Sequence, residues 1–235
     1  MKITHINTFI VDCYRTNWVF VQVTTDDGLT GVGEATLEGR EQTVVQAIAE
    51  LERYLVGQDP FAIELHHMRM QRDSYWRTGP VLSSAVSGVE MALWDIKGKA
   101  LGAPVYELLG GLVNDRIKVY ANGWFVGART AEEFADKAAA AVERGFRALK
   151  WDPFGRAYLT MSAQEMNTAL GIVAKVREAI GDDVDVIIEG HGRFDVKTAI
   201  QLGCELAAFH PAWFEEPVPP GAPEALAQVR AAAPV

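Results

Sequence analysis

Five ionisable side chains stand directly after three short apolar runs in the second half of the chain. Lys150 and Asp152 follow the first run, Glu189 and His191 the second, and Glu215 the third. Buried parallel strands read as continuous apolar runs, so charge appears where each strand emerges at its carboxyl end. Because neighbouring parallel strands share one such rim, we expect these five side chains to lie close together.

Each of these residue types is suited to a particular kind of chemistry. Carboxylates on rigid strand ends are the ligands that Mg²⁺ requires, so Glu189 and Glu215 are candidate metal ligands. His191 is a candidate proton-transfer group because the pKa of histidine lies near neutrality. Lys150 could neutralise a substrate carboxylate, and Asp152 could orient Lys150 or accept a proton. The alternative for all five is an ordinary solvated charge at a loop.

Alternating strands and helices must position these residues. Predicted strands lie at 117–121, 146–151, 184–189 and within 209–215. Predicted helices lie at 130–144, 162–180, 195–202 and 223–232. The first two helices open with capping boxes, in which Thr130 precedes Glu133 and Ser162 precedes Glu165 by three residues. About four strand–helix units of this kind indicate a parallel α/β sheet.

The first part of the chain has a different pattern. Residues 2–36 predict an antiparallel meander with a connecting loop at 13–18, and Gly31 and Gly33 predict a close approach of another segment. Helical spacing follows at 41–56, about 61–75 and about 81–100. We therefore predict two domains, residues 1–114 and residues 115–235.

Composition excludes several classes of partner. The 235-residue chain has a formal net charge of -9 and a sequence pI of about 5.1, with no basic stripe, which argues against nucleic acid and anionic membranes. No apolar run approaches the ~18 residues of a membrane span, so we expect a cytoplasmic protein. The two cysteines, Cys13 and Cys204, predict free thiols rather than a disulfide framework or a metal motif.

Several motifs together resemble the enolase superfamily, in particular its mandelate racemase and galactonate-like acid-sugar dehydratase subgroup. Besides Lys150, the resemblance rests on Gly-Val-Gly-Glu-Ala at 31–35, Ala-Leu-Trp-Asp-Ile-Lys-Gly-Lys at 92–99, Gly-Ala-Pro-Val at 102–105, Leu-Leu-Gly-Gly at 108–111, Glu-Gly-His at 189–191 and Trp-Phe-Glu-Glu-Pro at 213–217. The resemblance implies an α+β capping domain followed by a TIM-like (β/α) barrel. It also implies Mg²⁺ held by acids at the ends of three successive strands.

The resemblance assigns roles residue by residue. Glu189 and Glu215 match the first two metal ligands, although most members have Asp where Glu189 stands. His191 matches the histidine that protonates the leaving hydroxyl in galactonate-dehydratase-like members. Lys150 matches the first lysine of the racemase Lys-x-Lys motif, whereas Asp152 replaces the second lysine, which makes mandelate-type racemisation less favoured.

The resulting functional hypothesis is a Mg²⁺-dependent lyase that dehydrates a sugar acid, a small-molecule carboxylate. One alternative is a racemase or cycloisomerase that uses the same enediolate. Another is a catalytically incomplete homologue with a binding or structural role. Loops near the site would select the substrate, and the candidate substrate-binding residues are Asn17, Trp18, Trp76, Arg77, Asn122 and Trp124.

Four strand–helix units are too few to close an eight-stranded barrel. The third acidic ligand and the later histidine base implied by the resemblance are not in the sequence. We therefore expect the chain to stop part-way through a barrel. We also expect an open sheet edge that a second copy or the missing half completes, or that promotes aggregation, and hence a homo-oligomer.

Overall fold

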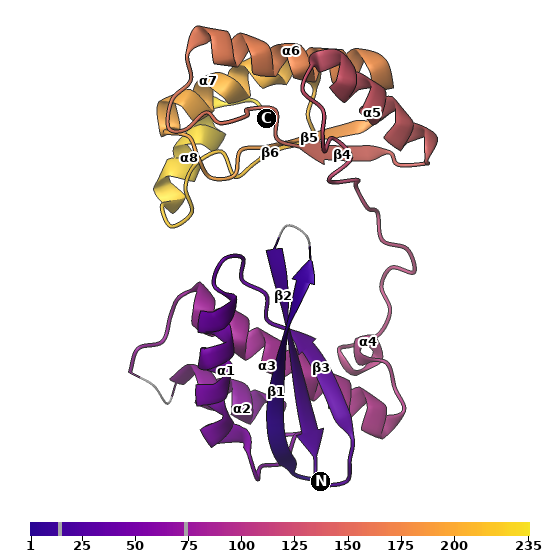
Figure 1. Cartoon of the computed structure of the whole chain (residues 1–235), viewed down its shortest axis with the longest axis vertical. Coiled ribbons are helices and arrows are strands. Elements are labelled where there is room, and N and C mark those ends of the chain that lie inside the picture. The colour runs from indigo at the N-terminus through magenta and orange to yellow at the C-terminus, as the bar shows by residue number, and fades with distance from the viewer. Residues whose placement is uncertain (14–15, 73–74) are drawn as a thin grey trace. The chain divides into compact units, whose positions relative to one another are not determined.

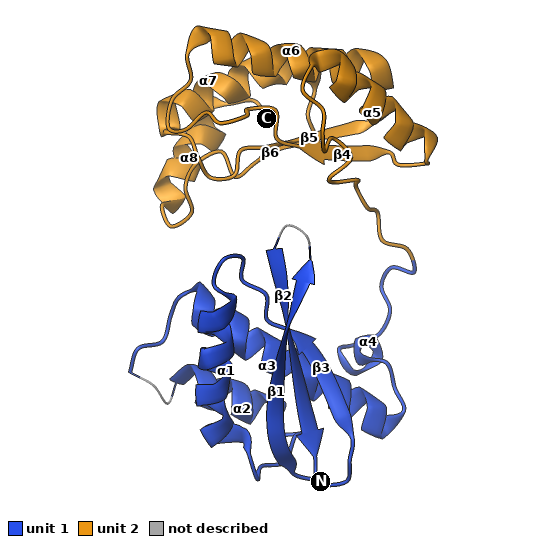
Figure 2. Ribbon diagram, in the orientation of Figure 1, with its two compact units in different colours: residues 1–115 blue, residues 116–235 orange. Residues whose placement is uncertain are grey.

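The structure, a computed structural model of the chain, describes residues 1–13, 16–72 and 75–235. These residues form two compact units, Met1–Asp115 and Arg116–Val235 (Figure 1 and Figure 2). The first unit contains an antiparallel sheet with helices, and the second contains a parallel sheet with helices. The predicted fold class, a capping domain followed by part of a barrel, is confirmed. No helix among the described residues combines the length and apolar character needed to cross a bilayer.

The first unit is built on a three-stranded antiparallel meander, as predicted. Its strands are β1 (Ile3–Cys13), β2 (Thr16–Thr25) and β3 (Thr30–Glu34), in that spatial order. The predicted loop at 13–18 is wrong, because the β1–β2 pairing continues through Asp12 opposite Asn17 to Cys13 opposite Thr16. Continued backbone pairing satisfies donors and acceptors that a loop would leave to water. Tyr14 and Arg15, also in that predicted loop, lie outside the described residues.

Two helices of the first unit, α1 (Glu41–Leu55) and α3 (Pro80–Leu101), pack against the strands of this sheet. Helix α2 (Ile63–Arg72) packs against both of these helices, and the short α4 (Val105–Leu108) packs against α3. The close approach predicted at Gly31 and Gly33 is made by α3: a Cβ on Gly33 would stand 1.9 Å from the carbonyl oxygen of Gly88. Helix α2 is shorter than the predicted 61–75, and Asp73 and Ser74 lie outside the described residues.

The second unit alternates strands and helices as predicted. Parallel strands β4 (Ala148–Trp151), β5 (Asp185–Glu189) and β6 (Trp213–Glu215) lie in that order. The accompanying helices are α5 (Ala131–Glu143), α6 (Ala163–Ile180), α7 (Val196–Leu206) and α8 (Pro223–Ala232). Both predicted capping boxes, at Thr130 and at Ser162, are present.

All four predicted strands are shorter in the structure. Strand β4 begins at Ala148 rather than at residue 146, and β5 begins at Asp185 rather than at residue 184. The strand predicted at 117–121 is reduced to a bridge in which Ala121 pairs with Leu149. The side chains of Ile117 and Val119 are exposed, so no burial draws this segment further into the sheet. Within 209–215 only β6 is a strand, because α7 and the 3₁₀ turn η1 (Ala207–Phe209) continue beyond the predicted helix end at residue 202.

The two faces of the parallel sheet have different neighbours. Leu149, Trp151, Val186 and Ile188 belong to the core formed with the helices. Successive side chains of a strand point to opposite faces, so the residues between them face away from that core. This alternation places Lys150 and Glu189 on the face that does not carry the helices.

Candidate active site

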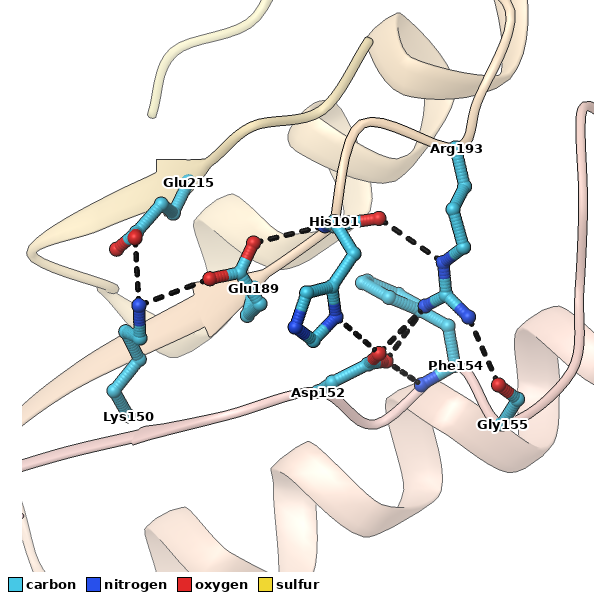
Figure 3. A network of polar contacts seen from close by, with 9 residues as sticks. Lys150, Asp152, Phe154, Gly155, Glu189, His191, Arg193 and Glu215 are labelled. Atoms are coloured by element: carbon cyan, nitrogen blue, oxygen red, sulfur yellow. Dashed lines mark hydrogen bonds and ion pairs between the residues drawn. The ribbon is translucent and has the colours of Figure 1, made fainter. Parts of the chain in front are cut away.

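Three charged side chains meet at the carboxyl ends of the parallel strands. The Lys150 Nζ on β4 lies 2.9 Å from Glu189 Oε2 on β5 and 2.6 Å from Glu215 Oε1 on β6 (Figure 3). Glu189 and Glu215 are register partners on adjacent strands, so their carboxylates are held side by side. We call Lys150, Glu189 and Glu215 the acid–lysine cluster.

Hydrogen bonds and opposite charges keep Lys150 and Glu215 ionised despite their burial. The exposed fraction of the side chain is 10% for Lys150, 6% for Glu189 and 29% for Glu215. Burial alone would lower the pKa of Lys150, but the hydrogen bonds and charges of the two glutamates outweigh burial and raise that pKa. Burial alone would likewise raise the pKa of Glu215, but hydrogen bonds from Lys150 and Trp213 outweigh it and lower that pKa.

Further groups fix the geometry of the two carboxylates. The second oxygen of Glu189 accepts the backbone N–H of His191 at 2.8 Å. The second oxygen of Glu215 accepts the indole N–H of Trp213 at 3.0 Å. The ring of Trp213 also lies edge-on to Tyr120, whose own ring centroid is 5.5 Å from the Lys150 Nζ. The two rings therefore form an aromatic border beside the cluster.

A second group of charges lies next to the first. The Nδ1 of His191 is 2.8 Å from Asp152 Oδ2, and the guanidinium of Arg193 donates to both oxygens of Asp152 (Figure 3). We call Asp152, His191 and Arg193 the histidine cluster. Asp152 was expected to orient Lys150 or accept a proton; among the described residues it bonds His191, Arg193 and the backbone N–H of Phe154, and not Lys150.

Backbone hydrogen bonds hold the loop that carries His191 against the end of β6. The backbone N–H of Gly190 donates to the carbonyl of Glu215 at 2.8 Å, and that of Gly192 donates to the carbonyl of Glu216 at 2.7 Å. A Cβ on Gly190 would stand 2.7 Å from the Glu216 carbonyl oxygen, so only glycine fits there. His191 itself has a φ of 50°, and its side chain is 44% exposed. The loop thus presents an accessible imidazole at the rim.

Two of the predicted substrate-binding residues lie in this unit, after the bridge at Ala121. The indole N–H of Trp124 donates to the backbone carbonyl of Lys150 at 3.0 Å, and its ring packs against Trp151. Asn122 is exposed, and its side-chain oxygen accepts the N–H of Gly123. Trp124 therefore supports the strand that carries Lys150, and a substrate-binding role for either residue stays a prediction.

The other four predicted substrate-binding residues belong to the first unit. Asn17 and Trp18 lie on β2, and Trp76 and Arg77 follow α2 in an exposed segment. Their roles also stay predictions.

Sequence reasoning missed Arg193, Trp213 and Tyr120. Arg193 lies two residues after His191, and Trp213 lies two residues before Glu215 on the same strand. Side chains two apart on a strand share a face, so Trp213 could have been placed beside Glu215 from its spacing. The role of Arg193 depends on a partner 41 residues earlier, which local spacing does not reveal.

The oxygen-rich part of the site suits a hard cation. Glu189 and Glu215 converge on one positively charged group, the ammonium of Lys150, with one oxygen each. Mg²⁺ is commonly bound through one or two carboxylates together with waters and substrate oxygens. No group of three or more His, Cys, Asp or Glu side chains in the described ranges is arranged to hold a metal. The two glutamates therefore fit as part of a magnesium ligand set.

Comparison with known proteins places the chain in a family. Residues 5–110 match the N-terminal domain of mandelate racemase / muconate lactonizing enzyme, and residues 133–235 match the enolase C-terminal domain-like family. The D-galactonate dehydratase of Pectobacterium atrosepticum is 41% identical over 93% of this chain and 56% of its own length. The D-gluconate dehydratase of Thermoproteus tenax is 42% identical over 85% of this chain and 40% of its own length. The chain thus spans about half the length of these curated relatives.

Solved structures share the fold over the whole chain. A member of the enolase superfamily from Salmonella Typhimurium superposes with a TM-score of 0.95 at 30% identity, covering 100% of this chain and 66% of that one. A mandelate racemase/muconate lactonizing enzyme from Jannaschia sp. CCS1 gives a TM-score of 0.91 at 33% identity, covering 100% and 66%. From its two matched domains and these relatives, the chain belongs to the mandelate racemase / muconate lactonizing enzyme family of the enolase superfamily.

Proposed function

We propose that this protein removes water from a sugar acid. In the proposed reaction the α-proton of the substrate carboxylate is abstracted, and the β-hydroxyl leaves as water. The resulting enol then becomes a 2-keto-3-deoxy acid. The proposal is supported by relatives named D-galactonate and D-gluconate dehydratase at 41% and 42% identity. It is also supported by a site that combines a proton donor with clustered charges.

The observation that carries the proposal is the way His191 is held. Its Nδ1 faces the Asp152 carboxylate, and its Nε2 has no partner among the described residues. A hydroxide ion is a poor leaving group, so cleavage of the β C–O bond requires a proton at that oxygen. We assign that proton to the Nε2 of His191. Asp152 stabilises the imidazolium that carries it and becomes the hydrogen-bond partner of the neutral ring afterwards.

The acid–lysine cluster acts on the other end of the substrate. Lys150 carries one positive charge against the two negative charges of Glu189 and Glu215, so the cluster as a whole would repel a carboxylate substrate. A further positive charge is needed for an anionic sugar acid to bind there. We assign that charge to Mg²⁺, with Glu189 and Glu215 as ligands, in keeping with their convergent oxygens.

The bound ion would supply Lewis-acid stabilisation of the negative charge that develops on the substrate oxygens. Lys150 stays protonated between two carboxylates and contributes a fixed positive charge beside the same oxygens. Its raised pKa suits this electrostatic role better than that of a base. In the proposed reaction the α-proton passes to a general base other than the five clustered rim residues predicted from sequence.

The predicted substrate-binding residues supply groups that suit a polyhydroxylated acid. Asn17 and Asn122 carry amides that exchange hydrogen bonds with hydroxyls, and Arg77 carries a charge that complements a carboxylate. Trp18 and Trp76 offer flat apolar rings to the carbon faces of a sugar. We propose these residues, with Trp124, as the groups that select among sugar acids.

A screen of aldonic acids in the presence of Mg²⁺ tests the proposal. We expect one or a few substrates to give a 2-keto-3-deoxy acid, detected as a product lighter by one water. Replacing His191→Gln should lower kcat at least about 100-fold with a small change in KM, because it removes the proton donor. A product that keeps every oxygen would instead identify a racemase or cycloisomerase. No turnover of any sugar acid would contradict the proposal.

A further inference from the structure

Arg193 is bonded through every nitrogen of its guanidinium group. Nε donates to the carbonyl of Gly190 at 3.0 Å, and Nη1 donates to the carbonyl of Gly155 at 2.8 Å. Nη2 donates to both oxygens of Asp152 at 2.8 Å (Figure 3). The side chain is only 18% exposed. Each nitrogen of the Arg193 guanidinium therefore donates a hydrogen bond to another group of the protein, and Arg193 is poorly placed to bind a substrate.

These bonds join two loops that come from neighbouring strands. Asp152 and Gly155 follow β4, whereas Gly190 and Arg193 follow β5. The hydrogen bonds to Asp152 join opposite charges, and such charge-assisted bonds are about twice as strong as neutral ones. One partly buried arginine thus determines how the two loops meet.

Arg193 also determines how Asp152 can rotate. Oδ1 of Asp152 accepts from the N–H of Phe154 and from Arg193, and Oδ2 accepts from His191 and from Arg193. Rotation of the carboxylate would break bonds at both oxygens. Oδ2 is consequently kept facing the Nδ1 of His191.

His191 depends on this arrangement because little else holds its ring. Its side chain is 44% exposed, and the Asp152 carboxylate is the only side-chain partner of the ring among the described residues. A neutral imidazole in water exchanges its proton between the two ring nitrogens. A fixed acceptor at Nδ1 selects the Nδ1–H form and leaves Nε2 for the reaction.

We propose that Arg193 is a positioning residue for His191, acting through Asp152. It holds the carboxylate that keeps Nδ1 protonated and turns Nε2 toward the substrate. This inference rests on the proposed function of His191 as the acid for the leaving hydroxyl. It concerns the arrangement of the ring, which can be measured whether or not a substrate is known.

The first experiment measures which ring nitrogen of His191 carries the proton, by ¹⁵N NMR of protein labelled at histidine. The His191→Gln variant identifies the His191 signals. In the unmodified protein we expect the neutral ring to be Nδ1–H, and in Arg193→Gln a mixture of both neutral forms. An unchanged proton position in Arg193→Gln would overturn the proposal.

The matched control is Arg177→Gln. The side chain of Arg177 is 11% exposed and donates to the carbonyls of Gly181, Val184 and Phe209, near the amino end of β5. Its loss removes comparable structural bonds, so it should lower thermal stability and leave the His191 signals unchanged. A shift of the His191 ring in Arg177→Gln equal to that in Arg193→Gln would reduce Arg193 to a general structural role.

The second experiment uses the sugar-acid assay. Arg193→Gln should lower kcat about 10- to 100-fold, the range seen when the outer partner of a functional histidine is lost, and should change KM less than about threefold. Arg193→Lys should recover part of kcat, because it restores the charge without the paired bonds. If Arg193 acts through Asp152, adding Arg193→Gln to Asp152→Asn should lower kcat less than about threefold further. Independent, multiplicative losses would contradict the proposal, and a lack of turnover by the unmodified protein would refute only the proposed function.

Discussion

The acid–lysine cluster and the histidine cluster lie at the ends of the same strands, but their charges are balanced differently. In the acid–lysine cluster one ammonium is shared by two carboxylates. In the histidine cluster one carboxylate is shared by a guanidinium and an imidazole. When its groups are ionised, the acid–lysine cluster has one more negative charge than positive charges. The histidine cluster has no excess of negative charge, because the single carboxylate of Asp152 is balanced by the guanidinium of Arg193.

This difference indicates that the two clusters have different roles. Excess negative charge at a buried position favours the binding of a cation, whereas matched charges favour a fixed geometry. Glu189 belongs to both arrangements, because one oxygen binds Lys150 and the other accepts the backbone N–H of His191. The contact with His191 involves only its backbone, so changes to the imidazole should leave the two proposed metal ligands in place.

The largest expected effect is the loss of the only ammonium in the acid–lysine cluster. Lys150→Met leaves Glu189 and Glu215 side by side without a cationic partner. Breaking a buried ion pair by removing one member typically costs about 3–5 kcal/mol, and we expect a loss near the lower end because Glu215 is partly exposed. Urea titration measures the change in the free energy of unfolding. Mg²⁺ at millimolar concentration should restore part of the loss.

Lys118→Met is the matched control for that experiment. Lys118 pairs with Asp185 at the other end of β5, and the lysine side chain is 76% exposed. Exposed pairs contribute little, so the free energy of unfolding should change by less than about 1 kcal/mol. Equal losses in the two lysine variants would show that burial does not distinguish the acid–lysine cluster.

Asp152→Asn should separate the tasks of the two clusters. The variant removes the charge that stabilises the His191 imidazolium, and we expect kcat to fall about 100-fold, or about 2.7 kcal/mol of transition-state stabilisation. The affinity for Mg²⁺ should stay within about twofold, because among the described residues Asp152 forms its hydrogen bonds with Phe154, His191 and Arg193 and not with Glu189 or Glu215. Calorimetric titration with Mg²⁺ and the sugar-acid assay measure the two quantities. A parallel loss of both would mean that the clusters form one unit.

Glu215→Gln should lower the affinity for Mg²⁺, which Asp152→Asn should leave nearly unchanged. It removes a negative charge while keeping the shape of the side chain, so the affinity for Mg²⁺ should fall at least about tenfold, or about 1.4 kcal/mol. The control is Glu178→Gln, which changes an exposed glutamate paired with Lys175 on α6 and should leave Mg²⁺ binding unaltered. Unchanged affinity in Glu215→Gln would show that Glu215 is not a ligand.

The smallest expected effect is that of Trp213→Phe. The substitution keeps an aromatic ring next to Tyr120 but removes the indole N–H that holds one oxygen of Glu215. We expect the affinity for Mg²⁺ to fall about threefold, because the carboxylate keeps its charge and loses only orientation. Trp94→Phe, in helix α3 of the first unit, is the control. Identical titrations for both tryptophan variants would exclude a role for the Trp213 hydrogen bond.

The sequence by itself determined the features that depend on local chemistry. The capping boxes at Thr130 and Ser162 involve residues three apart, and helices α5 and α6 begin where they predict. Apolar runs that end in charge placed Lys150, Glu189 and Glu215 at strand ends, because the core must exclude unpaired charge. A close approach of another segment was likewise predicted from Gly31 and Gly33, where a side chain would not fit, but only the structure identified that segment as α3.

The tertiary structure alone decided which charged groups became partners. Asp152 bonds His191 and Arg193, which are 39 and 41 residues away, and Lys150 bonds Glu215, which is 65 residues away. Such pairings depend on strand order, on register and on the path of each loop, which local patterns do not encode. The same reason explains why the predicted strand at 117–121 is only a bridge at Ala121: strand length depends on the neighbours that a segment finds after the chain has folded.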